Sequence, residues 1–238
     1  MTVAKQKKAV GGTAAPLKQQ AKVRTNTTKD SVCKIDVPVI KFADLWASYV
    51  TGNPYRDPKT GDVPPGFENQ CAIRMSATLH QVGIEMKSFT QANVTLAPGE
   101  QFGRILLHGK YTAVRANQMG SWLSKQPFCG LPPKPENITG KDWESRVKGR
   151  TGIVMFDGYW TRDGESSANA SGGHIDLWNG SRLTISGVGT AFATIGRYLG
   201  RNAFFPGTHF GWSDLASSKA IHFGNSHPNR TRVTLVRR

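Results

Sequence analysis

The sequence predicts an α+β fold in which N-terminal helices pack on a mostly antiparallel sheet. Apolar residues recur at steps of three and four in the first part of the chain, a spacing typical of helices that bury one face. From Arg150 onward the pattern changes to β-rich runs that alternate around turns. Helices that come first and strands that follow favour an α+β domain over an alternating βαβ arrangement.

The composition predicts one substantial domain with an unusual charge. The chain has 238 residues, is 38% apolar and carries a net charge of +15. Such a charge favours anionic partners such as nucleic acid, acidic lipid headgroups or an anionic wall polymer. No zinc-finger spacing, RNA-binding aromatic motif or basic heptad region accompanies it, so nucleic acid is not the expected partner. No apolar run is long enough to cross a membrane, and the N-terminus lacks the apolar stretch of a secretory signal.

Residues 1–34 are predicted to form a flexible basic tail. They are rich in Lys, Thr, Ala and Gln and contain almost no large apolar residue. Such a segment cannot bury enough surface to offset the entropy of ordering. The folded domain is therefore expected to span residues 35–238, although the part after about residue 187 is rich in Gly and aromatic residues and shows no assignable pattern.

Three helical segments are predicted in the first part of the domain. The first carries an apolar face of Phe42, Leu45, Trp46 and Tyr49. Residues 51–66 contain four prolines and three glycines and break the chain before the second helix. The second begins near Cys71 with Asn69 as its N-cap, ends at Gly83, and has an apolar stripe of Ala72, Met75, Leu79 and Val82. The third lies in residues 112–126, with its core side at Val114, Met119, Trp122 and Leu123.

Extended segments dominate the rest of the chain. Residues 93–99 and 103–109 are predicted to be short extended pieces, and residues 134–149 a loop with one helical turn. Residues 151–160 form a β-rich run, and residues 172–180 and 181–188 alternate around Asn-Gly, which predicts a β-hairpin. Residues 221–224 are predicted as a last strand.

Cys71 is the candidate nucleophile because it falls in the first turn of an amphipathic helix. The positive end of the helix dipole and the free N–H groups there stabilise a thiolate, and the same N–H groups can bind an oxyanion. The position alone leaves a structural cysteine open. No CxxC pair is present, so no structural zinc site is predicted, and Cys33 and Cys129 are either bystanders or one disulfide.

His174 is the candidate base. His80 lies nine residues beyond Cys71 on the same helix, too far along the axis to reach the thiol. His174 begins a predicted strand directly after two glycines, where another element can approach closely. Alternation places His174, Asp176 and Trp178 on one face of this strand and Ile175 and Leu177 on the other, core-facing side. The polar face either lines a cleft or is the outer face of an edge hairpin.

Two long motifs together resemble a known family. The stretches ENQCAIRMSATLHQVGI and GGHIDLWNGSRLT, with GRTGIVMFDGYW between them, are similar to the family 4 amidase effectors of the type VI secretion system. That family in turn resembles the papain-like NlpC/P60 cell-wall peptidases. The resemblance spans roughly Phe42 to Thr184, because FADLWASY and AVRANQMGSWL fit helices of the family.

The resemblance implies a cysteine amidase of papain-like α+β architecture that needs no cofactor and no metal. Cys71 would be the nucleophile and His174 the base. The implied substrate is the peptidoglycan stem peptide, cut between D-glutamate and meso-diaminopimelate. The implied partners are a cognate immunity protein and a component of the secretion apparatus. Such a toxin is made in the cytoplasm without a signal peptide and delivered to the periplasm of a target cell.

One position departs from the family pattern. The family places an acid directly after the Leu-Thr pair that follows Trp-Asn-Gly, and this chain has Ile185 there. Asp176, on the same strand face as His174, is then the nearest acid that can orient the imidazole, with Asn179 as the weaker alternative.

Two other functions stay open at this stage. One is an acyltransferase on the same scaffold, because hydrolysis and transfer share an acyl-enzyme. The other is a basic wall- or nucleic-acid-binding protein with a degenerate Cys-His site, which the charge and Ile185 favour.

Arg74 is expected on a solvated helix face, where it can also contact a substrate carboxylate. Trp46 is expected to pack in the core, and Trp178 to do so or to stack on substrate.

Overall fold

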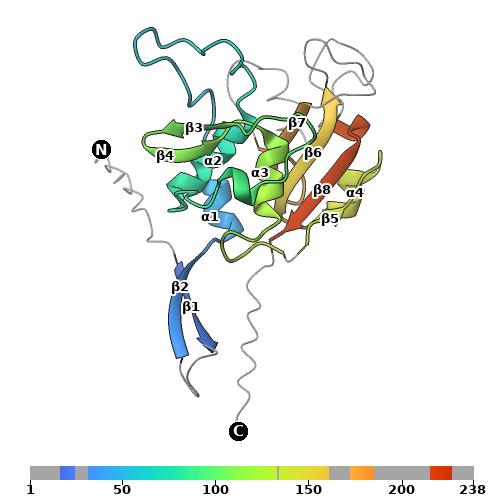
Figure 1. Cartoon of the computed structure of the whole chain (residues 1–238). Coiled ribbons are helices and arrows are strands. Elements are labelled where there is room, and N and C mark those ends of the chain that lie inside the picture. The colour runs from blue at the N-terminus through green and yellow to red at the C-terminus, as the bar shows by residue number, and fades with distance from the viewer. Residues whose placement is uncertain (1–16, 25–31, 133, 161–171, 185–214, 227–238) are drawn as a thin grey trace, which may run out of the picture.

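The computed structural model describes residues 17–24, 32–132, 134–160, 172–184 and 215–226. The helices are α1 (Phe42–Ala47), α2 (Cys71–Gln81), α3 (Ala116–Leu123) and α4 (Trp143–Val147), with short 3-10 turns at Gln91–Asn93 and Leu215–Ser217. The strands are β1 (Leu17–Arg24), β2 (Val32–Val39), β3 (Arg104–Leu107), β4 (Lys110–Ala113), β5 (Glu136–Asn137), β6 (Gly152–Trp160), β7 (Gly172–Trp178) and β8 (Ala220–Asn225). Figure 1 shows α1, α2 and α3 grouped beside the sheet that carries β6, β7 and β8.

The main sheet has four strands in the order β5-β8-β6-β7, and its pairings are all antiparallel. The long strand β6 lies between β7 and β8, with Val154 opposite both Asp176 and Phe223. The prediction of a mixed α/β chain with antiparallel strands is therefore confirmed. The edge strand β7 carries the candidate base and lies against α2 and α3.

Two apolar cores lie on the two faces of this sheet. On one face Ile153, Ile175 and Leu177 pack with α2 and α3, as the alternation of β7 predicts. On the other face β6, β7 and β8 pack with α4 and with Leu215. The buried members of this second core from the sheet are Val154, Phe156, Trp178, Ile221 and Phe223. The candidate site thus belongs to an edge strand that is anchored on both faces.

The Trp143 side chain is central to the second core. It is 2% exposed, and its ring makes edge contacts with Phe156 and Trp178 at centroid distances of 5.0 and 5.3 Å. We expect Trp143→Ala to lower the free energy of unfolding by about 3–5 kcal/mol, because it removes a large buried side chain and leaves a cavity. Urea unfolding followed by circular dichroism measures this. Leu106→Ala is the matched control: Leu106 is 60% exposed, and its loss should cost under about 0.5 kcal/mol.

The N-terminal segment differs from the prediction of a tail without structure. Strands β1 and β2 form an antiparallel hairpin with Leu17 opposite Val39 and Arg24 opposite Val32. Figure 1 shows this hairpin projecting from the body that carries the helices and the main sheet. Residues 17–24 and 32–34 of the predicted tail thus lie in strands, and β2 runs across the predicted boundary between residues 34 and 35. Backbone pairing can order a chain segment that lacks an obvious apolar pattern.

The first part of the predicted hairpin at Asn-Gly is present in the described residues. Strand β7 pairs with β6, and among residues 179–184 the structure shows one isolated bridge, Leu183 to Trp178. The turn itself is present, because the Asn179 side chain accepts hydrogen bonds from the backbone N–H groups of Ser181 and Arg182 and Gly180 has a φ of 97°. Residues 185–188 of the predicted second strand lie outside the described residues.

The other element predictions agree only in part. The expected helices correspond to α1, α2, α3 and the short α4, and the predicted last strand is β8. The extended piece predicted at residues 103–109 contains β3, which pairs with β4. The piece predicted at residues 93–99 is wrong, because no strand forms there, and the third helix starts later than predicted because residues 112–113 belong to β4. Val82 is the C-terminal cap of α2, and Val114 precedes α3. In the described part of the chain no helix has the length and apolarity needed to span a membrane.

Candidate active site

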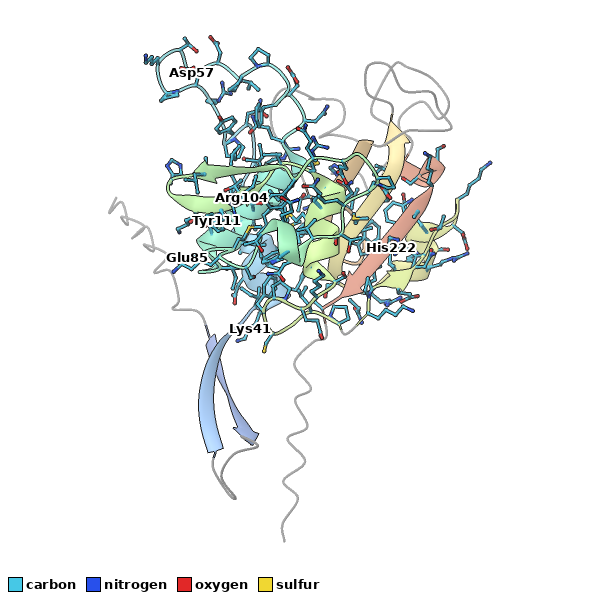
Figure 2. The ribbon with its side chains drawn as sticks, viewed as in Figure 1. Lys41, Asp57, Glu85, Arg104, Tyr111 and His222 are labelled. Atoms are coloured by element: carbon cyan, nitrogen blue, oxygen red, sulfur yellow. The ribbon has the colours of Figure 1, made fainter. Side chains whose placement is uncertain are left out.

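Helix α2 begins at Cys71 because the residue before it is anchored elsewhere. The Gln70 side chain accepts a hydrogen bond from the Tyr55 N–H at 2.9 Å and donates one to the Tyr55 carbonyl at 2.7 Å. Gln70 is therefore the N-cap residue, without a capping bond from its side chain, and the prediction that Asn69 caps the helix is wrong. This leaves the N–H groups of the first turn without a side-chain acceptor at the N-cap. Figure 2 shows Asp57 in the loop that leads into this helix.

Strand β7 brings His174 to the thiol of Cys71. The Cys71 Sγ atom lies 3.8 Å from the carbonyl oxygen of Gly173, the residue before His174. A Cβ on Gly173 would lie 3.1 Å from the Phe156 carbonyl and 3.3 Å from the Ala116 Cβ, so a side chain there would crowd both neighbours. The expectation that a glycine permits close approach at this point is confirmed. Cys71 is 7% exposed and His174 6% exposed.

Asp176 contacts the imidazole of His174. Its Oδ2 atom lies 3.1 Å from His174 Nε2, and its side chain is fully buried. The other oxygen, Oδ1, accepts hydrogen bonds from the Leu177 N–H at 2.8 Å and from the Thr184 hydroxyl. The three predicted site residues therefore come together: Cys71 from a helix start, and His174 and Asp176 from one face of β7. These hydrogen bonds fix the position of the Asp176 carboxylate beside the imidazole.

The thiol and the imidazole perturb each other. Burial alone would raise the pKa of Cys71, but the hydrogen bond and charge of His174, with the charge of Arg74, outweigh it and lower that pKa. Burial alone would lower the pKa of His174, but its hydrogen bonds with Asp176 and Cys71 outweigh it and raise that pKa. Both directions favour a thiolate–imidazolium pair. A nucleophile needs this form, because the thiolate and not the thiol attacks.

This pair predicts selective alkylation of Cys71. Iodoacetamide at pH 6 should modify Cys71 about tenfold faster than Cys129, because a lowered thiol pKa increases the thiolate fraction at that pH. Peptide-level mass spectrometry measures both rates in the same sample, with Cys129, a partly exposed free thiol, as the internal control. In His174→Ala the Cys71 rate should fall to or below the Cys129 rate. Equal rates in the wild-type protein would contradict the ion pair.

Sequence reasoning missed three supporting residues: Thr184, Tyr49 and Arg74. In the described part of the chain, the buried side-chain polar atoms without a well-aligned hydrogen bond are the Tyr49 hydroxyl and Arg74 Nε. Burial, and then the charge of Asp176, raise the pKa of Tyr49, whose hydroxyl lies beside Thr184 and Arg74. The sequence signals for this group were the Leu-Thr pair and the place of Arg74 three residues after Cys71.

Arg74 was expected on a solvated face of the helix, and this prediction is wrong. It is 9% exposed, and its Nη1 atom donates a 3.1 Å hydrogen bond to the Gly52 carbonyl. Among the described residues it forms no ion pair with a carboxylate. A buried guanidinium in the first turn of α2 adds positive charge next to the thiol, which agrees with the lowered pKa of Cys71.

Other candidate residues are placed away from this chemistry. Trp178 is 2% exposed and donates its Nε1–H to the Val147 carbonyl at 3.0 Å, so it packs in the second core and is not available to stack on substrate. The face of β7 that bears His174 is thus partly covered and does not form an open polar wall. Trp46 packs partly buried on the first core, with the Arg182 guanidinium 5.3 Å from its ring centroid.

The remaining predictions about single residues have mixed outcomes. His80 contacts the Tyr111 carbonyl at 2.9 Å, away from the thiol, as its position in α2 predicted. Asn179 is engaged in its own turn. Cys129 is a free thiol, so the alternative of a disulfide with Cys33 is wrong in this structure. Ile185 lies outside the described residues, and no group of three or more metal-ligating side chains occurs among those described.

Comparison with known proteins gives one family match. The model of the family described as "Type VI secretion system (T6SS), amidase effector protein 4" matches residues 67–223, well over half of the chain. Comparison with curated proteins gives no significant match.

Several solved structures are similar to this chain. The type VI effector Tae4 from Enterobacter cloacae is 17% identical with a TM-score of 0.46, covering 78% of this chain and 96% of its own. The effector Tae4 from Salmonella typhimurium, in complex with the immunity protein Tai4 from Enterobacter cloacae, is 20% identical with a TM-score of 0.37, covering 68% and 77%. A Salmonella typhimurium Tae4/Tai4 effector–immunity structure is 28% identical with a TM-score of 0.32, covering 49% and 62%.

Proposed function

The chain belongs to the amidase effector protein 4 family of the type VI secretion system, and from this premise we propose that it is a cysteine amidase that cuts the stem peptide of peptidoglycan. The observation that carries the proposal is the buried Cys71, His174 and Asp176 constellation, in which a thiol at a helix start adjoins an imidazole paired with a carboxylate. We further propose a papain-like NlpC/P60-type architecture and cleavage between D-glutamate and meso-diaminopimelate.

The first half-reaction forms an acyl-enzyme. His174 Nε2–H donates to Asp176, which leaves the other ring nitrogen to hold the proton taken from Cys71. The thiolate attacks the amide carbonyl carbon, and a tetrahedral oxyanion forms. The free N–H groups of the first turn of α2 are suited to stabilise it. The imidazolium then gives its proton to the leaving amine, the C–N bond breaks, and a thioester to Cys71 remains.

The second half-reaction hydrolyses the thioester. Neutral His174 accepts a proton from water, whose oxygen attacks the thioester carbonyl. Collapse of the second tetrahedral intermediate breaks the C–S bond and releases a carboxylate, and Cys71 returns to the thiolate paired with the imidazolium. Asp176 keeps the ring oriented through both halves and offsets the positive charge of the imidazolium.

Two partners follow from this proposal. An amidase that cuts the wall of other cells also endangers its producer, so we propose a cognate immunity protein that blocks the cleft, as the Tae4 structures named in complex with Tai4 suggest by analogy. We also propose delivery to the periplasm of a target cell through a component of the secretion apparatus. The net charge of +15 suits a substrate that carries free carboxylates.

The test is a product analysis. Purified protein is incubated with peptidoglycan sacculi that contain meso-diaminopimelate, and soluble fragments are identified by mass spectrometry. We expect fragments that end in D-glutamate and none from the His174→Ala variant. Their absence from both digests would overturn the amidase. Adding a primary amine as a competing acceptor separates hydrolysis from acyl transfer, because transfer would yield a conjugate of greater mass.

A further inference from the structure

Arg74 is held in place by the segment that follows α1. Its Nη1 atom donates a hydrogen bond to the Gly52 carbonyl at 3.1 Å, and its side chain is 9% exposed. Thr78, one turn further along the same side of α2, accepts a 3.0 Å hydrogen bond from the Val50 N–H and donates one to the Arg74 carbonyl at 2.8 Å. Two adjacent turns of α2 therefore bind residues 50–52, and this fixes the guanidinium.

The charge of this guanidinium has no carboxylate partner among the described residues. Such a burial is unusual, because charged side chains are seldom buried unless they are paired. Arg74 comes three residues after Cys71, within one turn of the helix. Burial alone would raise the pKa of Cys71, and the charge of Arg74 is one of the effects, after those of His174, that lower it. The fold thus keeps a costly positive charge close to the nucleophile.

Two hydroxyl groups connect this guanidinium to the acid of the site. The buried Tyr49 hydroxyl lies beside both Arg74 and Thr184, and the Thr184 hydroxyl donates to Asp176. Burial, and then the charge of Asp176, raise the pKa of Tyr49, so its hydroxyl keeps its proton. Thr184 has already donated its single proton, so it can only accept from Tyr49, and Tyr49 can then only accept from Arg74. Every group in this order donates toward the carboxylate.

The same order gives partners to two buried atoms. In the part of the chain that the structure describes, the buried side-chain polar atoms without a well-aligned hydrogen bond are the Tyr49 hydroxyl and Arg74 Nε. Buried polar atoms are nearly always hydrogen-bonded, and these two belong to neighbouring side chains. A hydrogen bond from Arg74 Nε to the Tyr49 oxygen would satisfy both atoms at once.

We propose that Arg74 is a positioning residue that acts on both ends of this site. Its charge acts directly on Cys71, and its hydrogen bond acts on Asp176 through the two hydroxyl groups. The inference rests on the proposed function, in which the thiol, the imidazole and the carboxylate act as one unit. The charged and titratable groups of this cluster come from α2, β7 and the segment after α1, and they are Cys71, Arg74, His174, Asp176 and Tyr49.

The first test measures the direct effect of the charge and needs no turnover. Arg74→Met should slow alkylation of Cys71 by iodoacetamide about fivefold at pH 6, because the thiolate fraction falls when the positive charge is lost. The variant and the wild type should react at similar rates at pH 9, where a thiol without such help is also ionised. Arg74→Lys keeps the charge and should restore most of the rate at pH 6.

Thr78→Val is the matched control for a purely structural role. It breaks the adjacent link between α2 and Val50 without changing any charge. It should lower the free energy of unfolding and leave the rate of Cys71 alkylation unchanged at both pH values. Equal slowing by Thr78→Val and Arg74→Met would overturn the proposal, as would a folded Arg74→Met protein that reacts like the wild type at pH 6.

A double-mutant cycle tests the chain of hydroxyl groups, and it requires no substitution of a buried charge. Tyr49→Phe removes one oxygen atom and should slow alkylation of Cys71 at pH 6 about threefold. The same substitution in a Thr184→Val background should have no further effect, because the chain is already broken. Tyr111→Phe is the matched control, since the ring of Tyr111 also faces an arginine but lies on β4. It should leave the rate unaltered.

Two outcomes of this cycle would overturn the chain. One is an unchanged alkylation rate in Tyr49→Phe, and the other is a pair of effects, from Tyr49→Phe and Thr184→Val, that multiply in the double variant. With a soluble stem peptide, Arg74→Met should lower kcat and leave KM unchanged, and a raised KM alone would mean that Arg74 contacts substrate instead. Product analysis of the wild-type protein decides the amidase activity separately, because the alkylation rates do not depend on turnover.

Discussion

Cys71→Ala is expected to abolish fragment release from sacculi, with a loss of at least about 10⁴-fold in rate, because the methyl group cannot form the acyl-enzyme. The fold should survive, since Ala favours helices and the Cys71 side chain is small, 7% exposed, and free of any disulfide. Release of labelled fragments measures the rate, and circular dichroism with a thermal melt measures the fold.

The matched control is Cys129→Ala. Cys129 is also a free thiol, but it lies outside the constellation of Cys71, His174 and Asp176, so this variant should release fragments like the wild type. Substantial lysis by a folded Cys71→Ala protein would exclude the covalent mechanism. It would not exclude wall binding, which should persist in this variant and weaken with salt.

The position of Cys71 in the first turn of a helix could be predicted from local patterns, although the residue at which the helix starts also depends on the Gln70 side chain bound to Tyr55. A stripe of apolar residues sets the helix, and the Pro- and Gly-rich stretch before it fixes where the helix can begin. Alternation on β7 separated His174 and Asp176 from Ile175 and Leu177 in the same way. The start of α2 can meet β7 because β7 is an edge strand of the sheet. No local sequence pattern predicts the order of strands in a sheet.

Local patterns could not predict which segments cover the faces of β7 and α2. Periodicity placed Trp178 on the same strand face as His174, but only the tertiary structure shows that α4, Leu215 and β8 form the apolar core that buries it. Arg74 was expected in solvent because charged helix residues are seldom buried. Its burial follows from the loop at Gly52, which supplies a carbonyl oxygen for the guanidinium. Contacts with segments distant in the sequence determine the burial of both Trp178 and Arg74.

Because this chain has Ile185 at the position where the resemblance implies an acid, Asp176 is the acid expected to orient the His174 ring. The resemblance implies that acid immediately after Thr184, and the structure has Asp176 Oδ2 at 3.1 Å from His174 Nε2. The Thr184 hydroxyl donates to the Asp176 carboxylate, so the residue before Ile185 supports the carboxylate that contacts the imidazole. Arg74 and the Tyr49 hydroxyl lie close to this group and provide positive charge and polarity around a fully buried carboxylate.

Asp176→Asn is therefore expected to lower kcat/KM by about 10³–10⁴-fold without unfolding the protein. The amide is nearly the same size, but it carries no charge to stabilise the imidazolium, and its NH₂ group can hold the ring in the wrong tautomer. Hydrolysis of a soluble stem peptide measures the loss. The selective alkylation of Cys71 at pH 6 should decline in parallel, because the raised pKa of His174 depends on the hydrogen bond to Asp176.

Two variants make the Asp176 result decisive. Asp142→Asn removes a carboxylate that pairs on the surface with Arg146 at 2.9 Å, and it should leave the rate unchanged. Thr184→Val removes one donor to Asp176 and should cost about tenfold. A folded Asp176→Asn protein with near-wild-type activity would assign the orienting role to another group. A graded loss from Thr184→Val to Asp176→Asn, with alkylation declining in the same order, would mean that the buried carboxylate of Asp176 orients the imidazole of His174.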